Sequence, residues 1–188
     1  MRAFGPTIAS AIATAVLATA PVEAAERISN DEYGFSVELP DGSPVCWGES
    51  GTHVHGVGTR LAGQDCAQPG PSLSLWADYN SAFLPDARHV LRYEGRCAGP
   101  KAAWARGEWR HAVGGLRTAM CHYERADGAV ELVLIGQTTR TEGGWGKAED
   151  KTPHIFHTVR LVTTKARYER DLEVFRRFVR SIRISPPR

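Results

Sequence analysis

Apolar and polar side chains alternate along several short stretches of the chain, the pattern of half-buried β-strands. In residues 33–40, Phe35, Val37 and Leu39 fall on one face, and Pro40 with the following Asp-Gly ends the run. Residues 72–79 repeat the pattern, with one face formed by Leu73, Leu75 and Ala77 and the other by Ser74, Trp76 and Asp78. Both segments therefore predict strands with one buried face.

Two further single strands are expected, one weak and one strong. Residues 54–61 alternate less regularly because glycines interrupt the run. Residues 155–163 carry Ile155, Val159 and Leu161 on one face. The glycine-containing segments 62–71 and 141–153 are expected to be loops.

The segment 116–139 has the pattern of a β-hairpin around an Ala-Asp-Gly turn. A two-residue Asp-Gly turn would place Glu124 opposite Glu131, and like charges directly opposite each other destabilise a strand pair. A three-residue loop with Gly128 in the left-handed region pairs Glu124 with Val130 instead. We expect the second register.

Two stretches have helical spacing. Residues 86–93 predict a short helix with Asp86 at its start. Residues 168–182 predict a longer closing helix, whose apolar stripe consists of Leu172, Phe175, Phe178, Val179 and Ile182. Glu173 precedes Arg177 by four residues, the favourable order for an ion pair. Acidic residues in the first turns favour packing of the stripe on a sheet over binding of the helix to a membrane surface.

The N-terminus has the layout of a secretory signal peptide. Arg2 precedes an uncharged run over 7–20, and Val22-Glu23-Ala24 places small residues before a cleavage point after Ala24. The run is shorter than the roughly 20 residues of a membrane-spanning helix. The alternative is an N-terminal anchor helix. We expect residues 1–24 to be a signal peptide and 25–188 to be a single globular domain, with no repeat or linker and no stable membrane insertion after cleavage.

Composition is that of an ordinary globular protein. The 188 residues include 42% hydrophobic and 23% charged residues, with 23 Lys+Arg against 21 Asp+Glu and a net charge of +2. These values exclude a disordered charged tail, a collagen-like repeat and a multi-span membrane protein. The near balance of charge supplies no general attraction to nucleic acid or anionic lipid.

All 4 cysteines lie after the signal segment, at Cys46, Cys66, Cys97 and Cys121. In an oxidising compartment, an even number of cysteines without a Cys-x-x-Cys pair predicts two disulfides rather than a zinc site. Three connectivities are possible. We favour Cys46–Cys66 with Cys97–Cys121, because each bond closes a Gly/Pro-rich excursion between candidate strands. Cys46–Cys121 with Cys66–Cys97 remains open. The cysteines and the signal peptide together predict an exported protein, periplasmic or extracellular.

The two ends of the mature chain resemble a known fold. The strand Tyr-Gly-Phe-Ser-Val-Glu-Leu-Pro at 33–40 is similar to the first strand of the PsbP-like fold, which includes the photosystem II extrinsic subunit and bacterial DcrB-type envelope proteins. The strand at 159–162 followed by the final helix is similar to the C-terminal end of the same fold. The resemblance implies an α+β fold, an antiparallel sheet flanked by helices in an α-β-α sandwich. It implies assembly, binding or accessory roles, while fold alone does not carry function.

Candidate metal ligands are His53 and His55, which are two residues apart and would project to the same face of a strand. A third ligand, Asp65 or Glu49, would complete a site, and a metal-dependent enzyme or metal-binding protein is the alternative function. His154 and His157 are three residues apart, a spacing that suits a helix better than the expected strand.

No nucleophile elbow or phosphate-binding loop occurs in the sequence, so no catalytic residue and no cofactor is assigned. Aromatic and basic residues interleave at 104–110, where Trp104, Trp109 and Arg110 are candidate binding residues, with Trp145 as a further candidate. Tryptophan and arginine are enriched among interface anchors. An export signal argues against nucleic acid as the partner. The first hypothesis is therefore a non-catalytic envelope protein with an accessory, assembly or immunity-type role that binds a protein partner.

Overall fold

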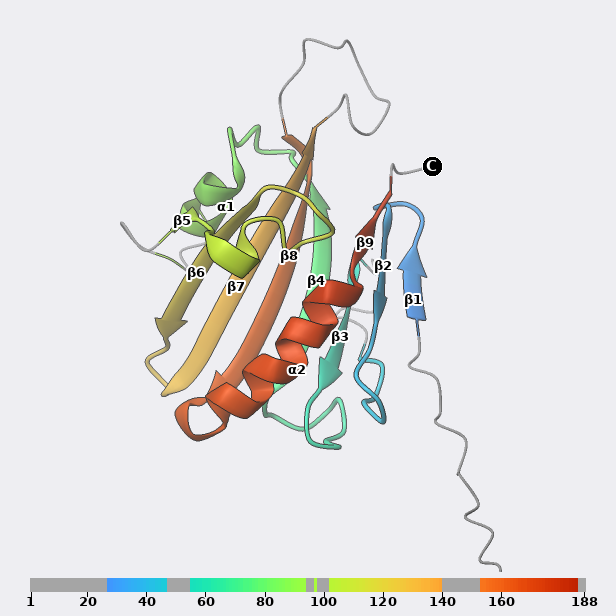
Figure 1. Cartoon of the computed structure of the whole chain (residues 1–188), viewed down its shortest axis with the longest axis vertical. Coiled ribbons are helices and arrows are strands. Elements are labelled where there is room, and N and C mark those ends of the chain that lie inside the picture. Colours follow the sequence, from blue (N-terminus) through green and yellow to red (C-terminus); the bar gives the residue numbers. More distant parts are fainter. Residues whose placement is uncertain (1–26, 47–54, 94–96, 98–101, 140–152, 186–188) are drawn as a thin grey trace, which may run out of the picture.

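The computed structural model describes residues 27–46, 55–93, 97, 102–139 and 153–185 (Figure 1). Within these residues the strands form two antiparallel sheets. The large sheet has, in spatial order, β3 (Gly56–Arg60), β4 (Ser72–Tyr79), β8 (Pro153–Thr164), β7 (Ala129–Thr139), β6 (Thr118–Glu124) and β5 (Ala103–Trp104). The small sheet contains β1 (Arg27–Asn30), β2 (Phe35–Glu38) and β9 (Arg183–Ile184).

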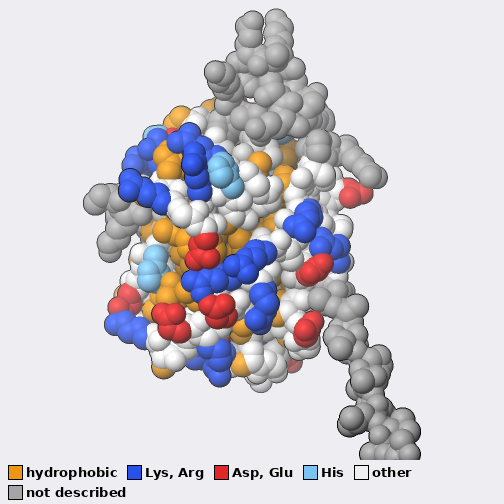
Figure 2. Space-filling model, viewed as in Figure 1, with side chains coloured by type: hydrophobic (Ala, Val, Ile, Leu, Met, Phe, Trp, Pro, Cys, Tyr) orange, Lys and Arg blue, Asp and Glu red, His pale blue; other side chains and the backbone are white. Residues whose placement is uncertain are grey.

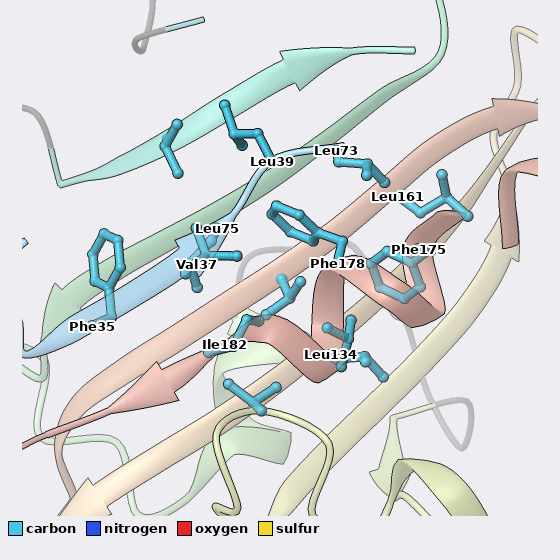
Figure 3. Close-up of a cluster of buried hydrophobic side chains, with 14 of the residues drawn as sticks. Phe35, Val37, Leu39, Leu73, Leu75, Leu134, Leu161, Phe175, Phe178 and Ile182 are labelled. Carbon is cyan, nitrogen blue, oxygen red and sulfur yellow. The ribbon is translucent and has the colours of Figure 1, made fainter. Parts of the chain in front are cut away.

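One face of the large sheet carries the main core. The helix α2 (Tyr168–Ser181) lies across this face, preceded by the 3-10 turn η3 (Lys165–Arg167), and the small sheet lies beside it (Figure 1). Figure 3 shows Phe175 and Phe178 of α2 directed toward apolar side chains of the strands. The core residues labelled there are Phe35, Val37, Leu39, Leu73, Leu75, Leu134, Leu161 and Ile182. The alternation in β2 and β4 and the helical stripe at 168–182 are confirmed, because the predicted apolar positions are buried.

The opposite face of the large sheet is covered over β6 and β7 by the short helix α1 (Ala87–Tyr93). Asp86 caps α1, as predicted, by accepting hydrogen bonds from the backbone N–H groups of Arg88 and His89. Although burial opposes ionisation, the hydrogen bonds from Arg88 and His89 hold the pKa of the Asp86 carboxyl well below its usual value. A sheet between α1 and α2 confirms the α+β fold with helices on both faces.

The hairpin of β6 and β7 has the three-residue loop that the charge argument predicts. Glu124 pairs with Val130, and Gly128 has a φ of 80°, in the left-handed region. Tyr123 instead of Glu124 lies opposite Glu131. The predicted strands at 54–61 and 155–163 correspond to β3 and β8.

Several details differ from the sequence expectations. The sequence pattern does not predict β1, β5 or β9, because β1 lacks a contrast between its two faces and β5 and β9 have two residues each. Glu173 pairs with Arg176, three residues away, rather than with Arg177. Arg176 is drawn to this position because Glu108, in the 3-10 turn η2 (Gly107–Trp109), also binds its guanidinium at 3.2 Å. The loop predicted at 141–153 lies outside the described residues, apart from Pro153.

The structure contains the favoured disulfide pairing, Cys46–Cys66 and Cys97–Cys121. Cys46 also forms an isolated antiparallel bridge with Gly58 of β3, so the first disulfide ties the segment before β3 to the loop after it. Cys121 lies on β6 beneath α1, and the second disulfide fastens the segment that follows α1 to the sheet. The first disulfide therefore holds the loop after β3 against the edge of the large sheet, and the second holds the segment after α1 against the sheet face.

Candidate functional site

Trp104 lies on β5, the edge strand of the large sheet, in a group of arginines. The guanidinium carbon of Arg117 lies 3.8 Å from the centroid of the Trp104 ring, and that of Arg88 lies 5.1 Å from it. Contacts of this kind between a guanidinium and an indole face are attractive. Arg106 is exposed beside them, and Arg88, Trp104 and Arg106 line the same shallow hollow. We call Arg88, Trp104, Arg106 and Arg117 the edge patch.

The backbone of β5 adds to the edge patch. The Ala105 N–H donates a hydrogen bond to the Thr118 carbonyl, at 2.9 Å. Because hydrogen bonding alternates along an antiparallel pair, the N–H and C=O of Trp104 point away from β6. Figure 2 shows basic side chains, Lys and Arg coloured alike, gathered at the upper left, near the place of β5 in Figure 1. The edge patch thus combines positive charge, an aromatic ring and strand hydrogen-bonding groups that face no further strand among the described residues.

Trp109 and Arg110 do not belong to this patch. Trp109 is half-buried against the main core, with its ring centroid 5.8 Å from that of Phe175. The Arg176 guanidinium lies 6.0 Å from the Trp109 ring centroid and covers it from outside. Arg110 is exposed, and its carbonyl accepts a hydrogen bond from the Thr118 N–H. Trp109 therefore acts as a packing residue, and Trp145 lies outside the described residues.

His55 lies in a row of rings at one end of the large sheet. Its Nδ1 is 2.9 Å from Asp78 Oδ1, and its ring centroid is 5.0 Å from that of Tyr33. Tyr33 in turn contacts Tyr79, whose ring meets that of His154. The carboxylate beside His55 is therefore Asp78 rather than the predicted Asp65.

His53 and Glu49 lie outside the described residues. Among the residues that are described, no group of three or more His, Cys, Asp or Glu side chains is placed to hold a metal ion. His154 and His157 are on opposite faces of β8, as their spacing in a strand requires.

The half of the large sheet that α1 leaves uncovered forms a hollow of about 840 Å³ over β3, β4 and β8. Trp76, Ser74 and Ser72 of β4 line it, together with Arg60 of β3 and Arg160 of β8. These are the polar-face positions of the strands. The sequence shows Trp76 on the same face as Ser74, and an aromatic residue on an otherwise polar strand face is the pattern that indicates such a hollow.

A buried ionic network supports one wall of the hollow. Glu131 of β7 is 1% exposed, and it accepts hydrogen bonds from Arg160 Nε and from the Tyr123 hydroxyl, the latter at 2.7 Å. A buried carboxylate requires such partners. Glu131 thereby fixes the Arg160 guanidinium in place.

A second buried polar group lies on the other face of β8. His157 is 0% exposed, and neither ring nitrogen has a hydrogen-bond partner among the described residues. Its neighbours across the sheet are Ala77 and Gly136, and the edge of its ring faces Phe35. Burial lowers the pKa of His157 to about 4. The imidazole is therefore neutral at physiological pH.

In the described part of the chain, no helix is both long enough and apolar enough to cross a membrane.

Comparison with known proteins addresses the fold. No protein-family model and no curated protein sequence matches the chain. The solution structure of cyanobacterial PsbP (CyanoP) from Synechocystis sp. PCC 6803 is similar, with a TM-score of 0.51 and 14% identity over 89% of this chain and 97% of that chain. The crystal structure of LpqN, involved in cell envelope biogenesis of Mycobacterium tuberculosis, has a TM-score of 0.43 and 11% identity over 88% of each chain. The likeness to cyanobacterial PsbP shows that the chain has the PsbP-like fold, as the resemblance at its two ends predicts.

Proposed function

We propose that this chain is an exported, non-catalytic protein of the cell envelope that binds a protein partner through the edge patch. The observation that carries the proposal is Trp104, placed on an edge strand beside Arg88 and Arg117. Tryptophan and arginine supply a large share of the energy at protein interfaces. An unpaired strand edge adds hydrogen bonds to an extended partner segment.

The charge of the edge patch defines the partner. Arg106 and Arg117 are exposed, and no carboxylate among the described residues forms an ion pair with either. The complementary partner segment is acidic, because opposite charges steer association and fix register. An exposed edge strand is normally protected from pairing with other chains by charge, and these arginines give it that protection until the partner arrives.

Export is supported by the signal-peptide pattern and by the two disulfides. An accessory or assembly role is consistent with a fold whose members serve in this way. The proposed compartment is periplasmic or extracellular.

The experiment is site-specific photo-crosslinking in the native host. A photo-reactive residue at position 106 should crosslink the partner through a segment rich in Asp and Glu. The double variant Arg106→Glu with Arg117→Glu should abolish the crosslink from a neighbouring position, because it reverses the charge of the patch.

The matched control is Arg177→Glu, a charge reversal at an exposed position on α2 that forms no ion pair with the described residues. It should leave the crosslink intact. The proposal fails if no specific partner is captured, or if the double variant captures the same partner as the unmodified chain.

A further inference from the structure

The hollow over β3, β4 and β8 is a second surface, at the opposite side of the large sheet from the edge patch. Its volume of about 840 Å³ is within the range of roughly 300–1,000 Å³ typical of small-molecule sites. The strand register shows how its side chains are arranged.

The floor of the hollow is two serines with an arginine on either side. Ser72 of β4 pairs with Arg60 of β3, and Ser74 pairs with Arg160 of β8. Neighbouring strands lie about 4.8 Å apart, so the backbones that carry the two arginines are separated by roughly 10 Å across β4. All four side chains line the hollow. Two guanidinium groups and two hydroxyl groups therefore line one hollow, with the serines between the strands that carry the arginines.

The two arginines are held in place but retain free donors. Arg160 is engaged through Nε by the buried Glu131, and its two Nη groups form no hydrogen bond with the described residues. Arg60 donates from Nη1 to the Gly70 carbonyl and from Nη2 to the Cys66 carbonyl. A guanidinium positioned in this way binds a carboxylate without first losing side-chain freedom.

The charges in the hollow are incompletely balanced. Arg125 is paired with Asp127, Asp78 with His55, and Arg160 with Glu131. Among the described residues, no carboxylate is within ion-pair distance of Arg60. Its positive charge is the one that a ligand would neutralise.

Trp76 extends the site along β4. It follows Ser74 by two residues, so it lies on the same face, and it also lines the hollow. Its cross-strand neighbours are Gly56 and Thr158, both small. Small neighbours leave the half-buried indole accessible from the hollow. A flat apolar surface next to short hydroxyl side chains suits a ring with apolar C–H faces and polar rim groups.

We propose that this hollow binds an acidic sugar. The sugar carboxylate lies over Ser72 and Ser74 between Arg60 and Arg160, and the ring packs against Trp76. The serine and threonine hydroxyls supply hydrogen bonds to the ring hydroxyls. The site is independent of the edge patch.

The test is a titration of isotope-labelled protein, followed by amide chemical shifts, with D-glucuronate as the probe. Glucuronate should shift the amides of β3, β4 and β8 and saturate below about 50 mM, while glucose and acetate should bind at least tenfold more weakly. Trp76→Ala and Arg60→Gln should each weaken glucuronate binding roughly tenfold or more. Trp76→Phe should retain most of the affinity.

Trp104→Ala, in the edge patch, is the matched control and should bind glucuronate like the unmodified chain. The spectrum of each variant without ligand reports whether it is folded, and Trp76→Phe keeps the test valid if Trp76→Ala is not. The proposal is overturned if glucuronate causes no saturable shift, if acetate or glucose binds as well as glucuronate, or if Trp76→Ala and Arg60→Gln bind normally.

Discussion

His157 links the stability of the fold to pH. Its ring is fully buried without a hydrogen-bond partner among the described residues, and its pKa falls from 6.5 to about 4 because burial disfavours the charged form. Well above pH 6.5 the imidazole is neutral in both folded and unfolded states and does not contribute to the pH dependence. As the pH falls from 6.5 toward 4, His157 is protonated in the unfolded chain but stays neutral in the folded chain. The free energy of unfolding therefore decreases. We expect a loss of about 3 kcal/mol across this window from His157 alone.

The measurement is urea unfolding followed by tryptophan fluorescence at several pH values between 7 and 4, for the unmodified chain and for His157→Leu. The variant removes a buried polar ring and should show a much weaker pH dependence over that window. His111→Leu, at an exposed position, is the control and should keep the original dependence. Identical slopes for the unmodified chain and His157→Leu would refute the prediction.

Glu131 and Arg160 should behave as a coupled pair. Arg160→Met leaves a buried carboxylate without its cation, which we expect to destabilise the fold by about 3–5 kcal/mol. Combining Arg160→Met with Glu131→Leu removes both charges and should recover most of that loss. A double-mutant cycle by chemical denaturation measures the coupling. If the double variant were as unstable as the sum of the single variants, the pair would contribute no coupling energy.

At the scale of elements, two glycines hold strands together for different reasons. Gly128 has a φ of 80° in the β6–β7 turn and open space around its Cα, so Gly128→Ala should cost about 1 kcal/mol through backbone strain alone. At Gly56 the conformation is ordinary, but an added Cβ would lie 2.8 Å from the Trp76 Cα and closer still to the Leu75 carbonyl. Gly56→Ala must therefore push β3 away from β4.

We expect Gly56→Ala to destabilise the fold by about 3 kcal/mol, clearly more than Gly128→Ala. Thermal or urea unfolding of the two variants provides the comparison. If Gly56→Ala destabilised the fold no more than Gly128→Ala, β3 could move away from β4 without loss of stability, and the prediction would be wrong.

The elements that the sequence predicts are those whose faces differ in polarity. Leu73, Leu75 and Ala77 alternate with polar residues because β4 has a core on one side and the open hollow on the other. The strand β1 has no such contrast, and β5 and β9 have two residues each, too few for any periodicity. Their pairing is determined by tertiary contacts, such as the hydrogen bond from the Ser185 N–H to the Gly34 carbonyl.

For the molecule as a whole, the arrangement of layers determines which surfaces are available. The small sheet and α2 cover one face of the large sheet, and α1 covers part of the other (Figure 1). The hollow and the edge patch are what these layers leave open. The sequence marks Trp104 as a candidate binding residue but does not indicate the arginines beside it, since Arg88 and Arg117 contact its ring only when α1 and the segment leading into β6 are in place.

Two disulfides constrain the molecule as a whole. Cys46–Cys66 and Cys97–Cys121 close loops with sequence separations of 20 and 24, for which chain entropy predicts a stabilisation of about 3 kcal/mol each. Disulfides form and persist in oxidising compartments, so under the proposed export both bonds form outside the cytosol. We expect the mature protein from its native host to begin at residue 25 and to contain no thiol that reacts with an alkylating reagent before reduction.

Intact-mass spectrometry measures both properties in one sample. After reduction, alkylation should add 4 groups, one for each cysteine. The variants Cys46→Ala with Cys66→Ala and Cys97→Ala with Cys121→Ala should each lose about 3 kcal/mol in urea unfolding. The same chain produced in a reducing cytosol without residues 1–24 should react with alkylating reagent without prior reduction and should unfold at lower urea. Four reactive thiols in the exported protein would contradict the disulfides and, with them, the proposed compartment.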